Sequence, residues 1–456
     1  MKHLLSVLFL VLCIVSFSSA QLKVSGDQKF LQTTNGKPFF WLGDTAWELF
    51  HRLDRKEAEL YLEDRAKKGF TVIQAVILAE LDGLEFPNPY GEKPLIGNDP
   101  LKPNEEYFKH VDYIIRKAEK LGLIMAILPS WGDKWNKASW GKGPEIFTPQ
   151  NARAFGEFIG RRYKSNSIVW VLGGDRAIEN QDDRDIITAM AAGLRKGDGG
   201  IHLQTFHPPG DMSSYNYFPN ANWIDFHMSQ SGHSTTSKNY KFNLKNAAGS
   251  PIRPHLDGEP RYEDHPDRWE PIKFGWMDDF DVRQTAYWSM LSGALGHTYG
   301  NHNIWQFYTE ERSPVSWART HWKAALDHPG SFQLGLMKRM FETRDWQNLI
   351  PDQSIFLSEN PENAEYNVGS VSNSGDFLMA YLPYGRETTI KTQKLNAAKL
   401  TAWLFNPRDG RSISLGSFEN TGTKIIKPHS EGRGSDWLVI IEDANKNFVN
   451  PGLSGK

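Results

Sequence analysis

Cysteine is almost missing from this chain of 456 residues, in which Cys13 is the only one. No disulfide can form within the chain, so a hydrophobic core must hold it together, and a chain of this length can bury one. Beyond the N-terminal segment no long apolar run follows, which argues against a membrane-spanning helix there. An excess of one charge is also missing. The formal net charge of −2 offers no basic footprint for a nucleic acid.

The first twenty residues have the order of an export signal. Lys2 precedes an apolar run from Leu4 to Phe17, and small residues follow up to Ala20. This order predicts a signal peptide over residues 1–20, cut after Ala20, and therefore a periplasmic or extracellular protein. Because Leu12 rather than Gly or Ala precedes Cys13, we do not expect lipid attachment.

Tryptophan, in contrast, is plentiful, with 16 residues in a chain that is 12% aromatic. Its flat, amphipathic ring serves both in cores and as a platform on which sugars stack. We expect about three quarters of these residues to be structural and the rest to be available for a ligand.

Apolar, β-branched segments alternate with helix-like segments over the first three quarters of the chain. Continuous apolar strands between helices indicate a parallel sheet covered on both faces, and eight such units predict a (β/α)8 barrel over residues 21–349. A doubly wound open sheet is the alternative. The expected strands are residues 39–42, 71–79, 123–128, 167–172, 201–206, 223–228, 252–256 and 297–299, and the expected helices are residues 55–68, 105–121, 149–163, 183–195, 280–295, 316–326 and 335–346.

From residue 350 onward the helical pattern gives way to short β-like runs. These runs, at residues 354–357, 376–382, 388–391, 400–405 and 437–441, predict a small antiparallel β-sandwich over residues 350–456.

Two acidic residues follow strands of the predicted barrel. Asp175 comes after Gly173 and Gly174 at the end of strand four, and Glu259 stands between Gly258 and Pro260 after strand seven. Strand breakers on either side predict a displayed carboxylate, and the carboxyl ends of barrel strands form the mouth where such enzymes place their chemistry. The alternative is structural: Asp175 would cap a helix and Glu259 would pair with Arg261.

A pair of carboxylates at one mouth is what glycoside hydrolysis requires. In a retaining enzyme one acid protonates the leaving oxygen while the other attacks the anomeric carbon, with the carboxyl groups about 5 to 5.5 Å apart. In an inverting enzyme they stand roughly 6.5 to 9.5 Å apart to admit water. Sequence spacing does not decide between the two.

Other residues near the predicted mouth are candidates for substrate binding. Tyr299 could donate a hydrogen bond to the nucleophile and tune its pKa. Arg176 and Arg261 could pair with a uronic carboxylate, although a structural partner is equally compatible. Asp44, Trp47, Trp131 and Trp305 could bind sugar hydroxyls or stack on a ring, with Trp131 and Trp305 expected in exposed loop positions.

Four motifs together resemble glycoside hydrolase family 140: Leu42-Gly43-Asp44-Thr45-Ala46-Trp47, Gly173-Gly174-Asp175, Asp257-Gly258-Glu259-Pro260-Arg261-Tyr262-Glu263 and Tyr299-Gly300-Asn301-His302-Asn303-Ile304-Trp305. The resemblance covers nearly all of the chain after the signal. It implies a barrel with a C-terminal domain of the collagen-binding type. It also implies a retaining apiosidase that cleaves D-apiose from galacturonic acid in the pectin rhamnogalacturonan II, with Asp175 as acid/base and Glu259 as nucleophile.

The end of strand four departs from the wider barrel superfamily, which commonly has Asn-Glu where this chain has Gly174-Asp175. The shorter aspartate requires a sugar closer to strand four or a longer strand. The missing asparagine leaves open which group binds the hydroxyl next to the anomeric carbon, with His207, His227 and Asp257 as candidates.

Two functions of other classes compete. A metal-dependent barrel hydrolase would use His207, His227, His255 and Asp257, but strand one lacks the expected His-x-His pair. A barrel without catalysis could instead be a polysaccharide- or collagen-binding protein, against which the presence of both acids speaks. We therefore expect a cofactor-independent monomeric glycosidase that acts on a pectic or other plant oligosaccharide or polysaccharide.

Overall fold

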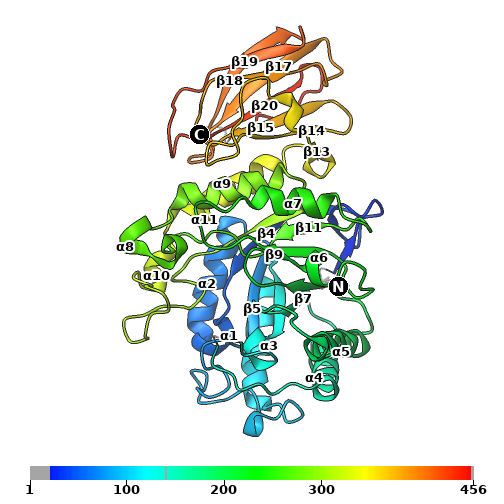
Figure 1. The fold of residues 1–456 in the computed structure, drawn as a ribbon, viewed down its shortest axis with the longest axis vertical. Coiled ribbons are helices and arrows are strands. Elements are labelled where there is room, and N and C mark those ends of the chain that lie inside the picture. Colours follow the sequence, from blue (N-terminus) through cyan, green and yellow to red (C-terminus); the bar gives the residue numbers. More distant parts are fainter. Residues whose placement is uncertain (1–20, 139–140, 453–456) are drawn as a thin grey trace, which may run out of the picture.

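The structure is a computed structural model that describes residues 21–138 and 141–452. The predicted signal peptide lies outside these residues. Two bodies are visible in Figure 1, a large α/β body that carries the N-terminal part of the chain and a smaller β body above it.

Eight parallel strands form a barrel in the larger body. Neighbouring strands pair in the order β8-β7-β6-β5-β4-β12-β11-β10, and the short antiparallel β9 (Met212–Ser213) extends the sheet beyond β10. The ring closes between β8 and β10, where the Asp225 amide donates to the Gln204 carbonyl at 2.9 Å. This closure makes the open-sheet alternative wrong. The eight strands are β4 (Trp41–Thr45), β5 (Val72–Leu78), β6 (Ile124–Ser130), β7 (Ile168–Gly173), β8 (Gln204–His207), β10 (His227–Gln230), β11 (His255–Asp257) and β12 (Gly296–Tyr299).

Helices follow most of the strands and cover the barrel from outside. The predicted start of α4 at Thr148 is confirmed: Thr148 and Asn151 form a reciprocal cap, and Pro149 occupies the first turn. The predicted helix over 316–326 is reduced to a single turn, because the backbone at Ser316 and Trp317 is left-handed. The longer helices are α2 (Arg55–Lys68), α3 (Glu105–Lys120), α4 (Pro149–Arg162), α5 (Gln181–Asp198), α7 (Asn239–Ala247), α9 (Asp279–Met290) and α11 (Pro329–Phe341), and the single turns are α1 (Leu49–Arg52), α6 (Ser214–Tyr217), α8 (Pro271–Phe274) and α10 (Trp322–Ala325).

Strand six begins later than the sequence pattern predicts. Trp223 and Ile224 are buried with Phe218 in the core but lie in a turn, and β10 starts only at His227. Their apolar character reflects burial of the turn. As a result His227 lies at the beginning of its strand rather than near its end.

Three further sheets lie outside the barrel, one before it and two after it in the described chain. A small three-stranded sheet precedes the barrel and consists of β1 (Leu22–Val24), β2 (Leu31–Thr33) and β3 (Pro38–Phe39). The C-terminal body is antiparallel as predicted, although residues 353–355 form a 3₁₀ turn instead of a strand. Its six-stranded sheet contains β13 (Leu349–Pro351), β14 (Val368–Ser372), β15 (Phe377–Leu382), β20 (Trp437–Asp443), β17 (Lys399–Phe405) and β18 (Ser412–Glu419), and a second sheet pairs β16 (Thr388–Lys391) with β19 (Thr423–Ile426).

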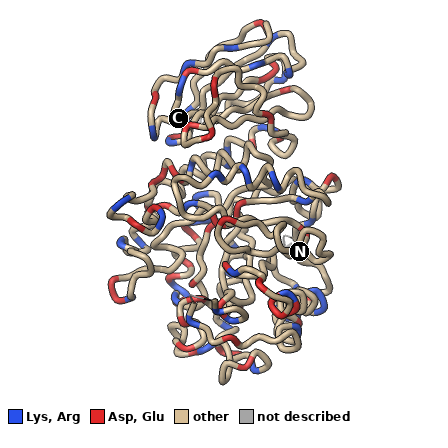
Figure 2. The backbone as a smooth tube through the Cα atoms, viewed as in Figure 1, with Lys and Arg blue, Asp and Glu red and all other residues tan. Residues whose placement is uncertain are grey.

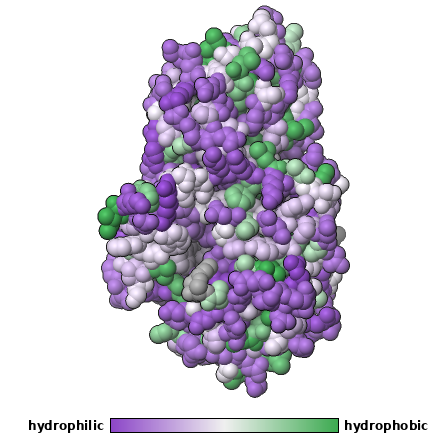
Figure 3. All heavy atoms as spheres, in the orientation of Figure 1, coloured by the Kyte–Doolittle hydropathy of each residue, from purple (hydrophilic) through white to green (hydrophobic). Residues whose placement is uncertain are grey.

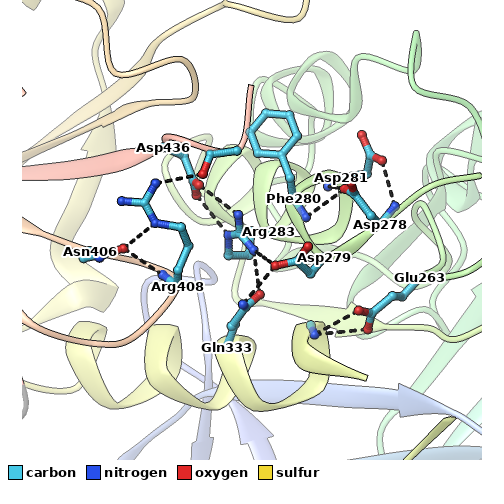
Figure 4. Close-up of polar contacts among 12 residues, drawn as sticks. Glu263, Asp278, Asp279, Phe280, Asp281, Arg283, Gln333, Asn406, Arg408 and Asp436 are labelled. Carbon is cyan, nitrogen blue, oxygen red and sulfur yellow. Dashed lines mark hydrogen bonds and ion pairs between the residues drawn. The ribbon is translucent and has the colours of Figure 1, made fainter. Parts of the chain in front are cut away.

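Helix α9 joins the barrel to the sandwich through buried contacts. Arg283 on this helix donates to both carboxylate oxygens of Asp436, at 2.9 and 3.1 Å (Figure 4). Both side chains are buried. The rings of Tyr287 and Tyr381 stack beside this pair, with centroids 4.7 Å apart. The two bodies therefore share a packed interface, with an ion pair removed from water.

Charge and hydropathy are mixed over the surface. Basic and acidic residues are interspersed along the backbone in Figure 2, and hydrophobic residues are scattered among hydrophilic ones on the face seen in Figure 3. Among residues 21–138 and 141–452, no helix has the length and hydropathy needed to cross a bilayer.

Candidate active site

A cavity of about 560 Å³ opens at the carboxyl ends of the barrel strands. Both acids singled out in the sequence, Asp175 and Glu259, line it. The described residues that contribute to its wall all belong to the barrel: Trp47, Glu80, Trp131, Asp175, Gly210, Asp211, Gln230, Gly232, His233, Ser234, Ser237, Glu259, Tyr262, His265, Arg268, Trp269, Trp305, Val315 and Ser316. A hollow of this size accommodates a small ligand.

Asp175 reaches the cavity through an unusual stretch of backbone. Gly173, Gly174 and Asp175 have φ of 98°, 97° and 56°, all left-handed. A Cβ on Gly173 would lie 2.3 Å from the His207 carbonyl oxygen, so glycine is required there for close approach of β8. A left-handed aspartate is uncommon, and such strain gathers at functional sites. The paired glycines thus turn the chain so that Asp175 faces the cavity.

The surroundings of the Asp175 carboxyl favour its protonated form. Burial raises its pKa well above the usual range, and the negative charges of Glu259 and Glu80 raise it further. The nearby Arg176 and a hydrogen bond with Gln230 oppose this rise. An acid that keeps its proton near neutral pH can act as a proton donor.

Glu259 has the opposite character. Burial alone would raise its pKa, but the neighbouring His207 and His233 outweigh burial and lower the pKa to about 2. His207 Nε2 lies 2.9 Å from Glu259 Oε2, and His233 Nε2 lies 3.0 Å from Oε1. The carboxyl is only 5% exposed, so the prediction of a displayed carboxylate is wrong. It lies instead at the base of the cavity, ionised between two imidazoles.

His207 connects the two acids. Its Nδ1 accepts a hydrogen bond from the Asp175 backbone amide at 3.2 Å, which places the ring proton on Nε2, facing Glu259. The ring packs edge-on against Trp47, with centroids 5.4 Å apart. This candidate substrate-binding residue therefore orients both acids instead of facing the cavity.

His233 is a site residue that sequence analysis missed. It lies three residues beyond the end of β10, in the loop where Arg261 donates to the carbonyl oxygens of Ser234, Thr235 and Ser237 at 2.9, 2.9 and 2.8 Å. Arg261 is buried, so the expectation that it binds a uronic carboxylate is wrong. Its guanidinium fixes the loop that presents His233 to Glu259.

Three of the predicted tryptophans surround the cavity. Trp47, Trp131 and Trp305 all line it, and the rings of Trp47 and Trp131 lie 5.2 Å apart. Trp131 and Trp305 are buried, at 2% and 7% exposure, and not exposed as predicted. Trp131 packs against Trp47 and His207, and Trp305 against His302. Indole faces beside two carboxyl groups suit the apolar face of a sugar ring.

Two other predicted residues have structural partners away from the cavity. Asp44 receives hydrogen bonds from Tyr61 at 2.7 Å and from Arg65 at 2.5 Å, in a fully buried cluster. The Tyr299 hydroxyl donates to Glu263 at 2.5 Å and not to the proposed nucleophile. Glu263 also accepts from the Gly330 amide at 3.1 Å, at the start of α11 (Figure 4). The predictions that Asp44 binds substrate and that Tyr299 bonds the nucleophile are therefore wrong, and both residues stabilise the structure around the barrel.

The histidine set of the metal-dependent alternative does not converge. His227 and His255 pair in register at the beginnings of β10 and β11, the opposite end from His207. Asp257 accepts from Ser231 at 2.6 Å and from Asn239 at 3.2 Å. Burial raises the pKa of Asp257 to about 6. His227 and Asp257 are thus not among the described cavity-lining residues, contrary to the prediction that they bind substrate.

Arg176 and Glu80 complete the polar surroundings. Arg176 donates to the carbonyl oxygens of Asn136 and Asp175 at 2.9 and 2.8 Å, so it braces the backbone around the acid. Glu80 follows β5 by two residues and lines the cavity, a role that sequence analysis missed. The rule that found Asp175, an acid just after a barrel strand, also points to Glu80.

Two family models match this chain, one over the barrel and one over the C-terminal body. The family model described as the apiosidase-like catalytic domain matches residues 25–348. The chain belongs to the apiosidase-like family. Residues 350–442 match the model described as "Putative collagen-binding domain of a collagenase". None of the curated proteins compared with the chain matches it.

Two solved structures of glycoside hydrolases are similar to this chain over nearly its whole length. A structure described as a glycoside hydrolase is 32% identical, with a TM-score of 0.87, and the match covers 95% of this chain and 99% of the other. A glycoside hydrolase family 5 protein from Bacteroides vulgatus is 30% identical, with a TM-score of 0.88, over 95% and 96% of the two chains. This apiosidase-like protein is therefore a glycoside hydrolase with a (β/α)8 barrel.

Proposed function

We propose that this protein is a retaining apiosidase that cleaves the bond between D-apiose and galacturonic acid in rhamnogalacturonan II. The observation that carries the proposal is that two acids in one cavity have pKa values shifted in opposite directions. Asp175 has a raised pKa and Glu259 a pKa of about 2. This is the combination of proton donor and nucleophile that a retaining glycosidase needs.

The reaction follows from these two states. Asp175 donates its proton to the glycosidic oxygen as the bond to the leaving sugar breaks, while a Glu259 oxygen bonds to the anomeric carbon. The now ionised Asp175 then takes a proton from water, whose oxygen displaces Glu259 and releases the sugar. The donors at 2.9 and 3.0 Å on Glu259 keep it ionised before attack and balance its charge when it leaves.

Retention is what the resemblance to glycoside hydrolase family 140 implies. The protonation tendencies of the two acids suit it, because a Glu259 whose pKa is lowered stays ionised and can attack the anomeric carbon directly. The charge of Glu259 in turn helps to raise the pKa of Asp175, so that Asp175 keeps the proton that the leaving oxygen needs.

Two separate observations support the choice of apiose and the export of the protein. The match to the apiosidase-like catalytic domain favours apiose as the released sugar. The N-terminal pattern around Ala20 favours export, which suits a polymer that cannot enter the cytoplasm intact. N-terminal sequencing of the protein from a periplasmic fraction would check the export proposal, and a chain that begins at Met1 there would contradict it.

The test is to incubate the purified protein with rhamnogalacturonan II oligosaccharides and with other pectic oligosaccharides. Released sugars are identified by chromatography, and the first-formed anomer by proton NMR. We expect free D-apiose with the anomeric configuration of the substrate. Release of another sugar would contradict the substrate proposal alone, and an inverted product would contradict the proposed retention.

A further inference from the structure

Glu80 is a third carboxyl group at the mouth of the barrel. It follows β5 by two residues and lines the cavity together with Asp175 and Glu259. Its charge contributes to the raised pKa of Asp175, and the charge of Glu259 contributes to its own. These electrostatic interactions indicate that Glu80 lies near both Asp175 and Glu259, the two acids proposed to act on the glycosidic bond.

The backbone next to Glu80 is held by a hydrogen bond to the buried side chain of Glu48. The amide of Leu81 donates to Glu48 Oε1 at 2.9 Å, and Glu48 Oε2 lies 2.6 Å from His51 Nδ1. Glu48 is fully buried, so this support is part of the barrel interior. Glu80 therefore has a defined position, unlike a side chain on a free surface loop.

The Glu80 side chain has no hydrogen bond or ion pair to any residue within 21–138 or 141–452. Other acids near the mouth already have hydrogen-bond donors. Asp133 accepts hydrogen bonds from the amides of Lys142 and Gly143, and Asp257 accepts hydrogen bonds from Ser231 and Asn239. Burial raises the pKa of Glu80 to about 8, and neighbouring acids raise it as well. A half-buried carboxyl without a partner is unfavourable unless a ligand supplies one.

We propose that Glu80 binds two neighbouring hydroxyl groups of the sugar whose glycosidic bond is cleaved. This proposal rests on the proposed roles of Asp175 and Glu259. A carboxylate has two acceptor oxygens that can face two hydroxyls on adjacent carbons, and a protonated carboxyl replaces one acceptor by a donor. Trp47 and Trp131 in the same wall offer a surface for the sugar ring, leaving its hydroxyl edge for Glu80.

This role separates sugars by the position of their hydroxyls. A site that pairs a buried polar group with a substrate hydroxyl rejects analogues that lack the hydroxyl, because the protein group is then left without a partner. Glu80 is thus a specificity-determining residue for the sugar bound next to Asp175 and Glu259.

The experiment is a cycle of protein variants and substrate analogues. Wild type, Glu80→Ala and Glu80→Gln are assayed on 4-nitrophenyl D-apioside and on analogues that lack one ring hydroxyl at a time. Glu85→Gln is the matched control, because Glu85 is exposed on the same loop and bonds Asn98 and Lys93 outside the cavity. Circular dichroism checks that each variant is folded.

Each of two neighbouring hydroxyls is expected to contribute about tenfold or more to kcat/KM in the wild type, mostly through KM. In Glu80→Ala, removal of either of these hydroxyls should cost nothing further, since the partner is already gone. Glu85→Gln should behave as wild type. If every deoxy analogue loses the same factor in Glu80→Ala as in the wild type, the proposal is wrong.

The outcomes distinguish failure of the Glu80 proposal from failure of the proposed choice of substrate. A wild-type protein that does not hydrolyse the apioside contradicts the choice of sugar, and the same cycle is then run on the 4-nitrophenyl glycoside of whichever sugar the oligosaccharide assay releases. Glu80→Gln still offers an oxygen and an amide to the hydroxyls and should keep part of each loss. If Glu80→Ala fails to fold, the cycle is completed with Glu80→Met, which keeps the length of the side chain but has no oxygen to bond a hydroxyl. Additive losses in Glu80→Met contradict the proposal equally.

Discussion

His207 places its Nε2 2.9 Å from Glu259 Oε2 while its Nδ1 accepts a hydrogen bond from the Asp175 amide. One imidazole thus sets the position of the proposed acid and the charge of the proposed nucleophile. Together with His233, it keeps Glu259 ionised in a place where burial alone would favour the protonated form.

Replacement of His207 is therefore expected to move the pH profile. In His207→Ala, Glu259 loses a donor to its ionised form, so its pKa rises from about 2 and the acidic limb of kcat/KM moves to higher pH. His207→Gln keeps a donor near the Nε2 position and should recover part of the shift. The measurement is kcat/KM against pH, with His429→Ala as the control on the exposed surface of the sandwich. An acidic limb that stays in place in His207→Ala would contradict this electrostatic role.

Arg261 should affect catalysis without touching the substrate. It holds three carbonyl oxygens of the loop that presents His233 to Glu259. Arg261→Lys keeps the charge but not the fork of donors, so kcat/KM should fall by about tenfold or more as the loop loses its hydrogen bonds. The control is Arg161→Lys on α4, which is 70% exposed. Unchanged kcat/KM in Arg261→Lys would show that the loop needs no such support.

The ion pair between barrel and sandwich gives a prediction for stability. In Asp436→Ala the Arg283 guanidinium remains buried without its bidentate partner, although Asp279 and Gln333 still contact it. The expected loss in free energy of unfolding is about 3 kcal/mol, within the range for breaking a buried pair. Urea unfolding measures it, with the exposed Lys427→Ala as the control. A loss no larger than that of the control would mean that the interface does not depend on this pair.

The strand count and the placement of the two acids could be derived from the sequence because they depend on local features. Apolar runs between helices mark the strands, and the carboxyl ends of parallel strands meet at one mouth. Asp175 and Glu259 therefore fall in one cavity although they are distant in sequence. The paired glycines at 173 and 174, visible in the sequence, occupy positions where a Cβ would meet neighbouring backbone.

The details of the site depended on information that a single sequence does not carry. The apolar residues around Trp223 predict a strand where the chain forms a turn, and this prediction places His227 at the mouth instead of His233. Which acid Tyr299 contacts, and that Arg261 turns toward backbone carbonyls, depend on side-chain directions fixed by tertiary packing. Glu259 is buried between His207 and His233, which are distant in sequence, and local sequence patterns do not predict such long-range packing.

The central claim is that Asp175 is the acid and Glu259 the nucleophile, and the most direct test is the leaving-group dependence of two variants. Asp175→Asn and Glu259→Gln are assayed on the natural oligosaccharide and on the 4-nitrophenyl glycoside of the same sugar, with circular dichroism to confirm folding. Glu259→Gln should lose about three orders of magnitude or more on both substrates. Asp175→Asn should lose about 100-fold or more on the oligosaccharide and far less on the aryl glycoside, whose leaving group needs little protonation. Full turnover in either variant, or equal losses of Asp175→Asn on both substrates, would contradict the account.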